Sequence, residues 1–280
     1  MITIPAPKNY NEWRDLARGL LLENISPQEL LWQPADEVSL FNDAFIFSAK
    51  PTNLRITKGF LELAKTAACY RSGEQWPILY SMLWRLTHGE PHLLNLSTDP
   101  EVHQIKAMVK SISRDIHKMH AFVRFRKTED CEITGREQFV SWFEPEHHIV
   151  RLTSGFFRKR FSGMDWSILT PDDCMHWNGK TIHFTAGVDK SKAPDEDAQD
   201  ELWRTYYRNI FNPARLKVKA MQSEMPKKYW KNLPEAEIIE ELIASSSQQT
   251  QAMLERPTSP EKPAPKNSYL EKISKLGDAS

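Results

Sequence analysis

Features that identify large classes of proteins are missing from this sequence. No run of about 18 consecutive apolar residues occurs, so no membrane-spanning helix is predicted. The first residues have no basic segment followed by an apolar stretch, which predicts no secretory signal and a cytoplasmic protein. Three scattered cysteines, Cys69, Cys131 and Cys174, form no CxxC pair. This argues against a disulfide framework, a cysteine zinc site and an iron–sulfur cluster.

Nucleotide-binding motifs and metal-ligand spacings are also absent. With only 10 glycines and no GxxxxGK[ST], GxGxxG or GxSxG string, the chain predicts no phosphate-cradling loop and no cofactor. Of the nine histidines, the adjacent His147 and His148 would point to different faces of a helix, and Cys174 with His176 lacks a second ligand pair. We therefore predict no metal site. The 37 basic and 37 acidic residues give a net charge of zero, so any charged binding surface must be confined to part of the chain.

The first 95 residues predict a mainly helical N-terminal region. Asn11 is placed to cap a helix whose apolar residues recur at intervals of three and four. Further helices are expected at about 54–69 and 77–87, with an irregular stretch at 32–53.

The clearest predicted helix runs from about 100 to 120. Asp99 is its expected N-cap and Pro100 its first residue. One face carries a narrow apolar seam, and the other a basic stripe with Glu101 and Asp115 as the local acids. The predicted seam consists of Val102, Ile105, Val109, Ile112, Ile116 and Met119, and the stripe of Lys106, Lys110, Arg114 and Lys118. An ordinary solvated helix face would give the same stripe.

Residues 96–245 predict a conserved α+β module with a mixed or antiparallel sheet of about five strands. A strand is expected within 121–127, and another at 138–143 is apolar on both faces and therefore interior. A helix at about 147–161 precedes a meander whose last turn is Asn178-Gly179, a pair suited to a type I′ hairpin. An acidic loop at 187–201 leads to a C-terminal helical block. Residues 246–280, rich in Ser, Gln, Pro and charge, predict a disordered tail.

The segment 203–231 is the densest charge feature of the chain. The segment contains eight Lys and Arg residues and a single acid, Glu224, so its net charge is +7. Aromatic residues lie between the cations along the sequence. Such a surface suits nucleic acid, because cations pair with phosphates and aromatic rings stack on unpaired bases. Aromatic residues in a core with cations in water would produce the same pattern. The nucleic-acid-binding candidates are Trp203, Arg204, Arg208, Arg215, Lys217, Lys219, Lys227, Lys228, Tyr229 and Trp230, with Arg124 and Arg126 assisting.

The string EPEHH holds the best acid/base candidates, Glu144, His147 and His148. A carboxylate beside an imidazole can hold a tautomer or tune a pKa. The string matches no established catalytic motif, and a structural cap at the start of a helix is the favoured interpretation.

Several longer strings resemble a known family. They are MHAFVRFR (119–126), FEPEHHI (143–149), WSILTPD (166–172), LWRTYY (202–207), IFNPARLKVKAMQSEMPKKYW (210–230) and NLPE (232–235). The chain resembles proteins assigned to DNA repair or DNA metabolism that carry a conserved domain of unknown function. The resemblance implies a radical SAM protein as partner, and a uracil-DNA-glycosylase-like domain that is fused in some members. It supplies no catalytic residues.

The leading hypothesis is a DNA repair or DNA modification protein that binds DNA through the basic-aromatic surface and acts with a radical SAM partner. One alternative is an enzyme that processes a damaged or modified base, with Glu144, His147 or His148 as acid or base. Another is an interaction scaffold for the radical SAM protein.

Overall fold

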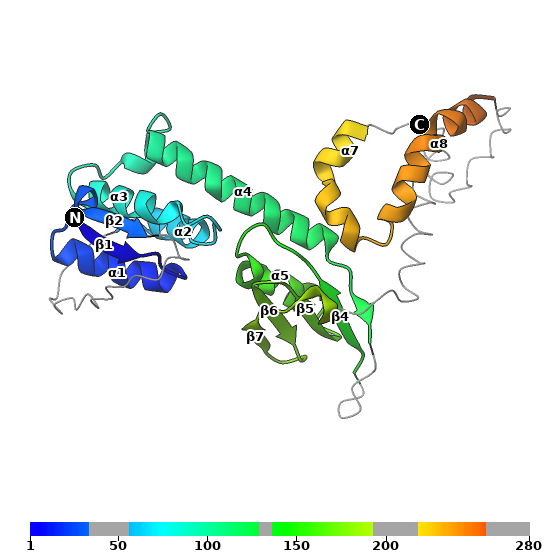
Figure 1. Ribbon diagram of the computed structural model, residues 1–280, viewed down its shortest axis with the longest axis horizontal. Coiled ribbons are helices and arrows are strands. Elements are labelled where there is room, and N and C mark those ends of the chain that lie inside the picture. The colour runs from blue at the N-terminus through cyan, green and yellow to red at the C-terminus, as the bar shows by residue number, and fades with distance from the viewer. Residues whose placement is uncertain (34–55, 129–135, 193–217, 256–280) are drawn as a thin grey trace, which may run out of the picture.

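The computed structural model describes residues 1–33, 56–128, 136–192 and 218–255 (Figure 1). The N-terminal lobe contains β1 (Ile2–Pro5), α1 (Tyr10–Leu22), a 3-10 turn (Pro27–Glu29), β2 (Leu30–Gln33), α2 (Lys58–Ala67) and α3 (Gln75–Thr87). The cap of α1 is Asn9 rather than Asn11, because the Asn9 side chain accepts hydrogen bonds from the backbone N–H groups of Asn11 and Glu12. The lobe therefore has the expected helices at 58–67 and 75–87.

The parallel pair β1–β2 was not predicted. Its register aligns Ile2 with Leu30 and Pro5 with Gln33, and α1 connects the two strands. Each strand has four residues, which is too short for an alternating pattern to stand out. The lobe thus contains a small β1–α1–β2 unit whose strands end on the same side.

Helix α4 (Pro100–Phe122) joins the N-terminal lobe to the rest of the protein (Figure 1). Asp99 caps it as predicted, and Pro100 is its first residue. Its buried residues belong to two separate apolar clusters: Val102, Ile105 and Met108 to that of the N-terminal lobe, and Ile112 and Met119 to that of the sheet. One helix therefore contributes to both cores.

The predicted α+β class is confirmed by a mixed sheet of five strands in the order β3-β4-β5-β6-β7. The strands are β3 (Arg126–Lys127), β4 (Gln138–Trp142), β5 (Asp165–Leu169), β6 (Asp173–Trp177) and β7 (Ile182–Ala186). β4 is interior, and it pairs in parallel with β5 through the connecting helix α5 (Val150–Arg160), while the other pairs are antiparallel. Gly179 has φ of +82° in the β6–β7 turn. The predicted type I′ hairpin is wrong, because such a turn needs positive φ at both Asn178 and Gly179, whereas Asn178 lacks it and Trp177 pairs with Ile182 across four loop residues.

The C-terminal part is helical, as expected. It contains α7 (Val218–Glu224), a 3-10 segment (Lys227–Asn232) and α8 (Ala236–Glu255), preceded by a 3-10 turn at Lys190–Lys192. Helix α8 continues through 246–255, where the sequence predicted the start of a tail; residues 256–280 lie outside the described residues. Among the described residues, no helix combines the length and the apolarity needed to cross a bilayer.

Candidate functional site

The exposed face of α4 carries the predicted basic stripe. Lys106, Lys110 and Arg114 are exposed and follow one another every fourth residue, about 6 Å apart along the helix axis. Lys106 donates to the carbonyl of Leu94 at 3.2 Å. Within the part of the chain that the structure describes, Lys110 and Arg114 have no hydrogen-bond or ion-pair partner. Their charges therefore face solvent.

No acid interrupts this stripe. Glu101 is engaged by Arg85, whose guanidinium lies 2.8 Å from its carboxylate. Asp115, expected on the stripe, instead takes a seam position and is 1% exposed. The exposed residues of α4 thus include no acid.

Lys118, the fourth residue of the predicted stripe, has a structural role. Its ammonium group donates to the backbone carbonyls of Ser223 and Glu224 at the end of α7. Cations are favoured at this end of a helix because of the helix dipole and the free carbonyls. Lys118 therefore attaches α7 to α4, and its side chain is only 14% exposed.

The basic-aromatic block is described only in part. Trp203, Arg204, Arg208, Arg215 and Lys217 lie outside the described residues, and the side chain of Lys219, within α7, does too.

In the described part of the block, Lys227 and Lys228 are exposed, but the neighbouring aromatic residues are not free platforms. Tyr229 is 3% exposed, stacks on Phe143 with ring centroids 5.4 Å apart, and donates to Asp115 at 3.1 Å. Trp230 is half-buried and donates to the carbonyl of Met225. In this conformation Tyr229 cannot stack on a base, so we revise its role from nucleic-acid contact to core residue.

The two assisting arginines also differ from the expectation. Arg124 lies 2.7 Å from Glu235, whose side chain is 4% exposed, and it donates to the carbonyl of Ala121. This ion pair commits Arg124 to holding α8 against the end of α4. Arg126 begins the edge strand β3 and is half-buried.

Glu144, a predicted acid or base, is held in a surface ion pair. It accepts a hydrogen bond from Trp142 at 2.9 Å and one from Lys231 at 2.5 Å. Burial alone would raise its pKa, but the bonds from Lys231 and Trp142 outweigh burial and hold the pKa below its ordinary value. Glu144 therefore stays ionised, which is unfavourable for a proton donor. The neighbouring Glu146 likewise pairs with Lys228.

His147 is enclosed by protein. It is 7% exposed, its ring stacks on Tyr70 with centroids 4.6 Å apart, and its Nε2 lies 2.9 Å from the Ser111 hydroxyl. Burial lowers its pKa more than the acids Asp115 and Glu146 raise it, so the ring is neutral. Nδ1 has no hydrogen-bond partner. The free-energy cost of leaving it unpaired is lowest in the tautomer in which Nε2 carries the proton and donates to the Ser111 hydroxyl. Asp115 accepts from the His147 backbone N–H rather than from the ring, so the three residues do not form a catalytic triad.

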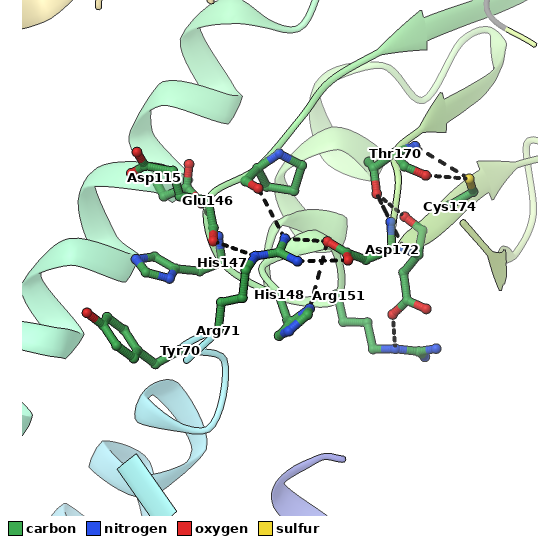
Figure 2. A network of polar contacts seen from close by, with 12 residues as sticks. Tyr70, Arg71, Asp115, Glu146, His147, His148, Arg151, Thr170, Asp172 and Cys174 are labelled. Carbon is green, nitrogen blue, oxygen red and sulfur yellow. Dashed lines mark hydrogen bonds and ion pairs between the residues drawn. The ribbon is translucent and has the colours of Figure 1, made fainter. Parts of the chain in front are cut away.

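His148 is the acid/base candidate that faces solvent. Figure 2 shows its imidazole beside Arg71 and Asp172, with one ring nitrogen turned toward Asp172. Its Nδ1 is 3.9 Å from the Asp172 carboxylate, and its side chain is 46% exposed. Burial and the charge of Arg71 lower its pKa against the opposing effect of Asp172. The ring is therefore neutral near pH 7 and can accept or donate a proton.

Arg71 holds together the loops around His148, and it was not among the site residues predicted from the sequence. Its guanidinium makes a bidentate pair with Asp172 and donates to the backbone carbonyls of Pro145 and Glu146 (Figure 2). The hydrogen bonds from Arg71 also keep the pKa of Asp172 below its ordinary value. Arg71 and Asp172 are 101 positions apart in sequence, and no local pattern could pair them.

Comparison with known proteins gives one match. The family model described as a domain of unknown function, DUF4130, matches residues 73–235. The matched range begins at Gly73, two residues before α3, ends at Glu235, and includes the α4 stripe, His147 and His148. No curated protein and no solved structure matches the chain.

Proposed function

The chain belongs to the DUF4130 family, and from that premise we propose that it is a DNA repair or DNA modification protein that binds DNA through the exposed face of α4. The observation that carries the proposal is the row of Lys106, Lys110 and Arg114 with no acid on the same face. Phosphate contacts supply most of the affinity of proteins that bind DNA irrespective of sequence. A helix whose cations are spaced one turn apart can contact successive phosphates of a DNA backbone.

The geometry favours backbone contact over base recognition. Among the exposed residues of α4 there is no Trp, Tyr or Phe ring on which an unpaired base could stack, and the exposed rings of this face are the smaller imidazoles of His103 and His117. Contacts to phosphates alone position a protein without reading sequence. We therefore expect this surface to bind DNA of any sequence. Within the described part of the basic-aromatic block, Lys228 and Lys231 are paired with Glu146 and Glu144, so we expect Lys227 to be the cation there that is available to DNA.

The experiment is fluorescence anisotropy with labelled single- and double-stranded oligonucleotides across a salt series. Reversing both charges in Lys110→Glu/Arg114→Glu should weaken binding at low salt by about tenfold or more. The slope of log K against log salt should become shallower by about 2, because each phosphate contact contributes roughly 0.9 in duplex DNA. A further variant, Lys217→Ala/Lys219→Ala, tests the basic-aromatic block separately.

The matched control is Lys58→Glu/Lys180→Glu, which makes the same change in net charge at exposed residues of α2 and the β6–β7 turn. It should retain the wild-type salt slope. Absence of binding at low salt, or equal effects of the two double variants, would refute the α4 surface. Titrations repeated with a radical SAM protein present test the partnership implied by the family resemblance, which predicts tighter DNA binding by the pair.

A further inference from the structure

A cavity of about 590 Å³ lies between the β1–α1–β2 unit and the residues around His148 and Arg71. Its walls are the carboxyl ends of β1 and β2, the segment from Tyr70 to Pro77, and His148. In open α/β sheets, ligands bind beyond the carboxyl ends of parallel strands, and the β1–α1–β2 unit presents those ends here. The volume is in the range of small-molecule sites.

Aromatic rings that line this cavity are held in place by contacts with other rings. Trp32 packs against Tyr80 at 6.3 Å between ring centroids, and Tyr70 stacks on His147. Both rings are half-buried, so part of each remains available. Trp76 adds a third ring to the lining. Rings held this way suit a planar ligand, because stacking on them requires little loss of side-chain freedom.

Gln75 supplies an unpaired acceptor. Its Nε2 donates to the carbonyl of Tyr70 at 2.8 Å, which fixes the orientation of the amide. Its Oε1 has no partner, although the side chain is 1% exposed and the residue lines the cavity. A buried acceptor without a donor is unfavourable. An N–H group on a ligand that reaches Gln75 from the cavity would satisfy it.

One cation at the rim of the cavity, Lys8, is available to an anionic ligand. Lys8 and Arg71 line the cavity together with Glu74. The donors of Arg71 are directed at Asp172 and two carbonyls, so its planar face remains for stacking. Lys8 keeps its ammonium group for a ligand, and α3 begins at this wall, where the helix dipole favours negative charge.

We propose that this cavity binds a single nucleotide unit, either free or at an unpaired position of a strand. The base stacks on the ring of Trp32 or Tyr70 and donates an N–H to Gln75, His148 bonds a polar edge, and the phosphate lies near Lys8. For a nucleotide within DNA the inference rests on the proposed function; for a free nucleotide it does not.

The test is isothermal titration calorimetry of the full chain with the four deoxynucleoside monophosphates and the matching nucleosides. We expect saturable binding of at least one monophosphate. His148→Ala should weaken it by about tenfold, equivalent to ~1.4 kcal/mol. Lys8→Glu should weaken the monophosphate and leave the nucleoside unchanged. His92→Ala and Lys180→Glu, at exposed positions elsewhere, are the matched controls and should bind as the wild type does.

The outcomes separate this inference from the DNA surface. Absence of heat with every monophosphate, or equal binding by His148→Ala and its control, overturns the cavity proposal whatever happens with DNA. In strands, an oligonucleotide with one bulged nucleotide should bind more tightly than its fully paired counterpart. His148→Ala should abolish that preference, whereas Lys110→Glu/Arg114→Glu should weaken both strands equally. Binding of monophosphates without binding of DNA supports the cavity and refutes only the α4 surface.

Discussion

Asp115 shows how one buried polar residue can define a region of the molecule. Its carboxylate accepts from the backbone N–H of His147 at 2.9 Å and from the Tyr229 hydroxyl at 3.1 Å. These bonds join α4 to the β4–α5 loop and to the 3-10 segment before α8. Burial raises the pKa of Asp115, and the two hydrogen bonds offset that effect only in part.

The raised pKa of Asp115 makes its contribution to stability depend on pH. The folded protein holds this proton more tightly than the unfolded chain, so stability falls as pH rises from the ordinary carboxyl range, about 3.9, through the raised folded pKa. Asp115→Asn removes that titration. We expect the unfolding free energy of the wild type, relative to Asp115→Asn, to decline as pH rises through this window, measured by urea denaturation at a series of pH values.

Asp115→Ala provides the contrast. It leaves the His147 N–H and the Tyr229 hydroxyl without their acceptor, so we expect a loss of about 2 kcal/mol or more at neutral pH. A difference between wild type and Asp115→Asn that does not change with pH would contradict the raised pKa.

At the scale of elements, local signals predicted α4 well. The Asp99 carboxylate accepts from the backbone N–H groups of Glu101 and Val102, and its second oxygen lies 2.7 Å from Arg85. The hydrogen bond from Arg85 is the main reason that the pKa of Asp99 is lowered. Asp99 thus combines a helix cap with an ion pair.

Asp99→Ala should lower the unfolding free energy by about 1–2 kcal/mol, because the first turn of α4 loses its cap. Asp99→Asn keeps a capping acceptor but loses the charge and with it the ion pair with Arg85, so its effect at neutral pH should be smaller than that of Asp99→Ala. Because the folded pKa is depressed, the stability supplied by the charge is present above the ordinary carboxyl pKa and is lost as pH falls through the folded value. Thermal unfolding at neutral and acidic pH measures both effects; equal losses for the two variants would contradict a capping role.

Elements with a local signal could be predicted, and contacts distant in sequence could not. The Asp99 cap, the α4 seam and the position of the Asn178-Gly179 turn depend on neighbouring residues, and the sequence predicted them, whereas the cap of α1 and the type of that turn were predicted wrongly. The Arg71–Asp172 pair and the β1–β2 pairing depend on the fold. The inward position of Asp115 was missed because a single acid next to a basic stripe looks like part of it. For the same reason Tyr229, between lysines, was assigned to the surface.

At the scale of the whole molecule, α4 connects two cores. Val109 packs against the apolar cluster of the N-terminal lobe, and Ile112 belongs to the cluster of the sheet. The helix therefore passes from one core to the other within one turn. The hydrogen bonds of Arg71, here called the Arg71 clamp, form a second link between the two parts of the protein. They join the segment after α2 to the β4–α5 and β5–β6 loops. We expect these links to make the wild type unfold in a single cooperative transition.

Lys110 lies at the change from one core to the other and is exposed, so it can be replaced without disturbing either cluster. Lys110→Pro removes one helical hydrogen bond and crowds the preceding turn, at a cost of about 3 kcal/mol. We expect scanning calorimetry of this variant to show two overlapping transitions, with a van't Hoff enthalpy below the calorimetric one. Lys110→Ala removes the same charge while preserving the helix, and it should retain one transition. A single transition in Lys110→Pro would show that the Arg71 clamp and the lobe contacts couple the two cores without a continuous α4.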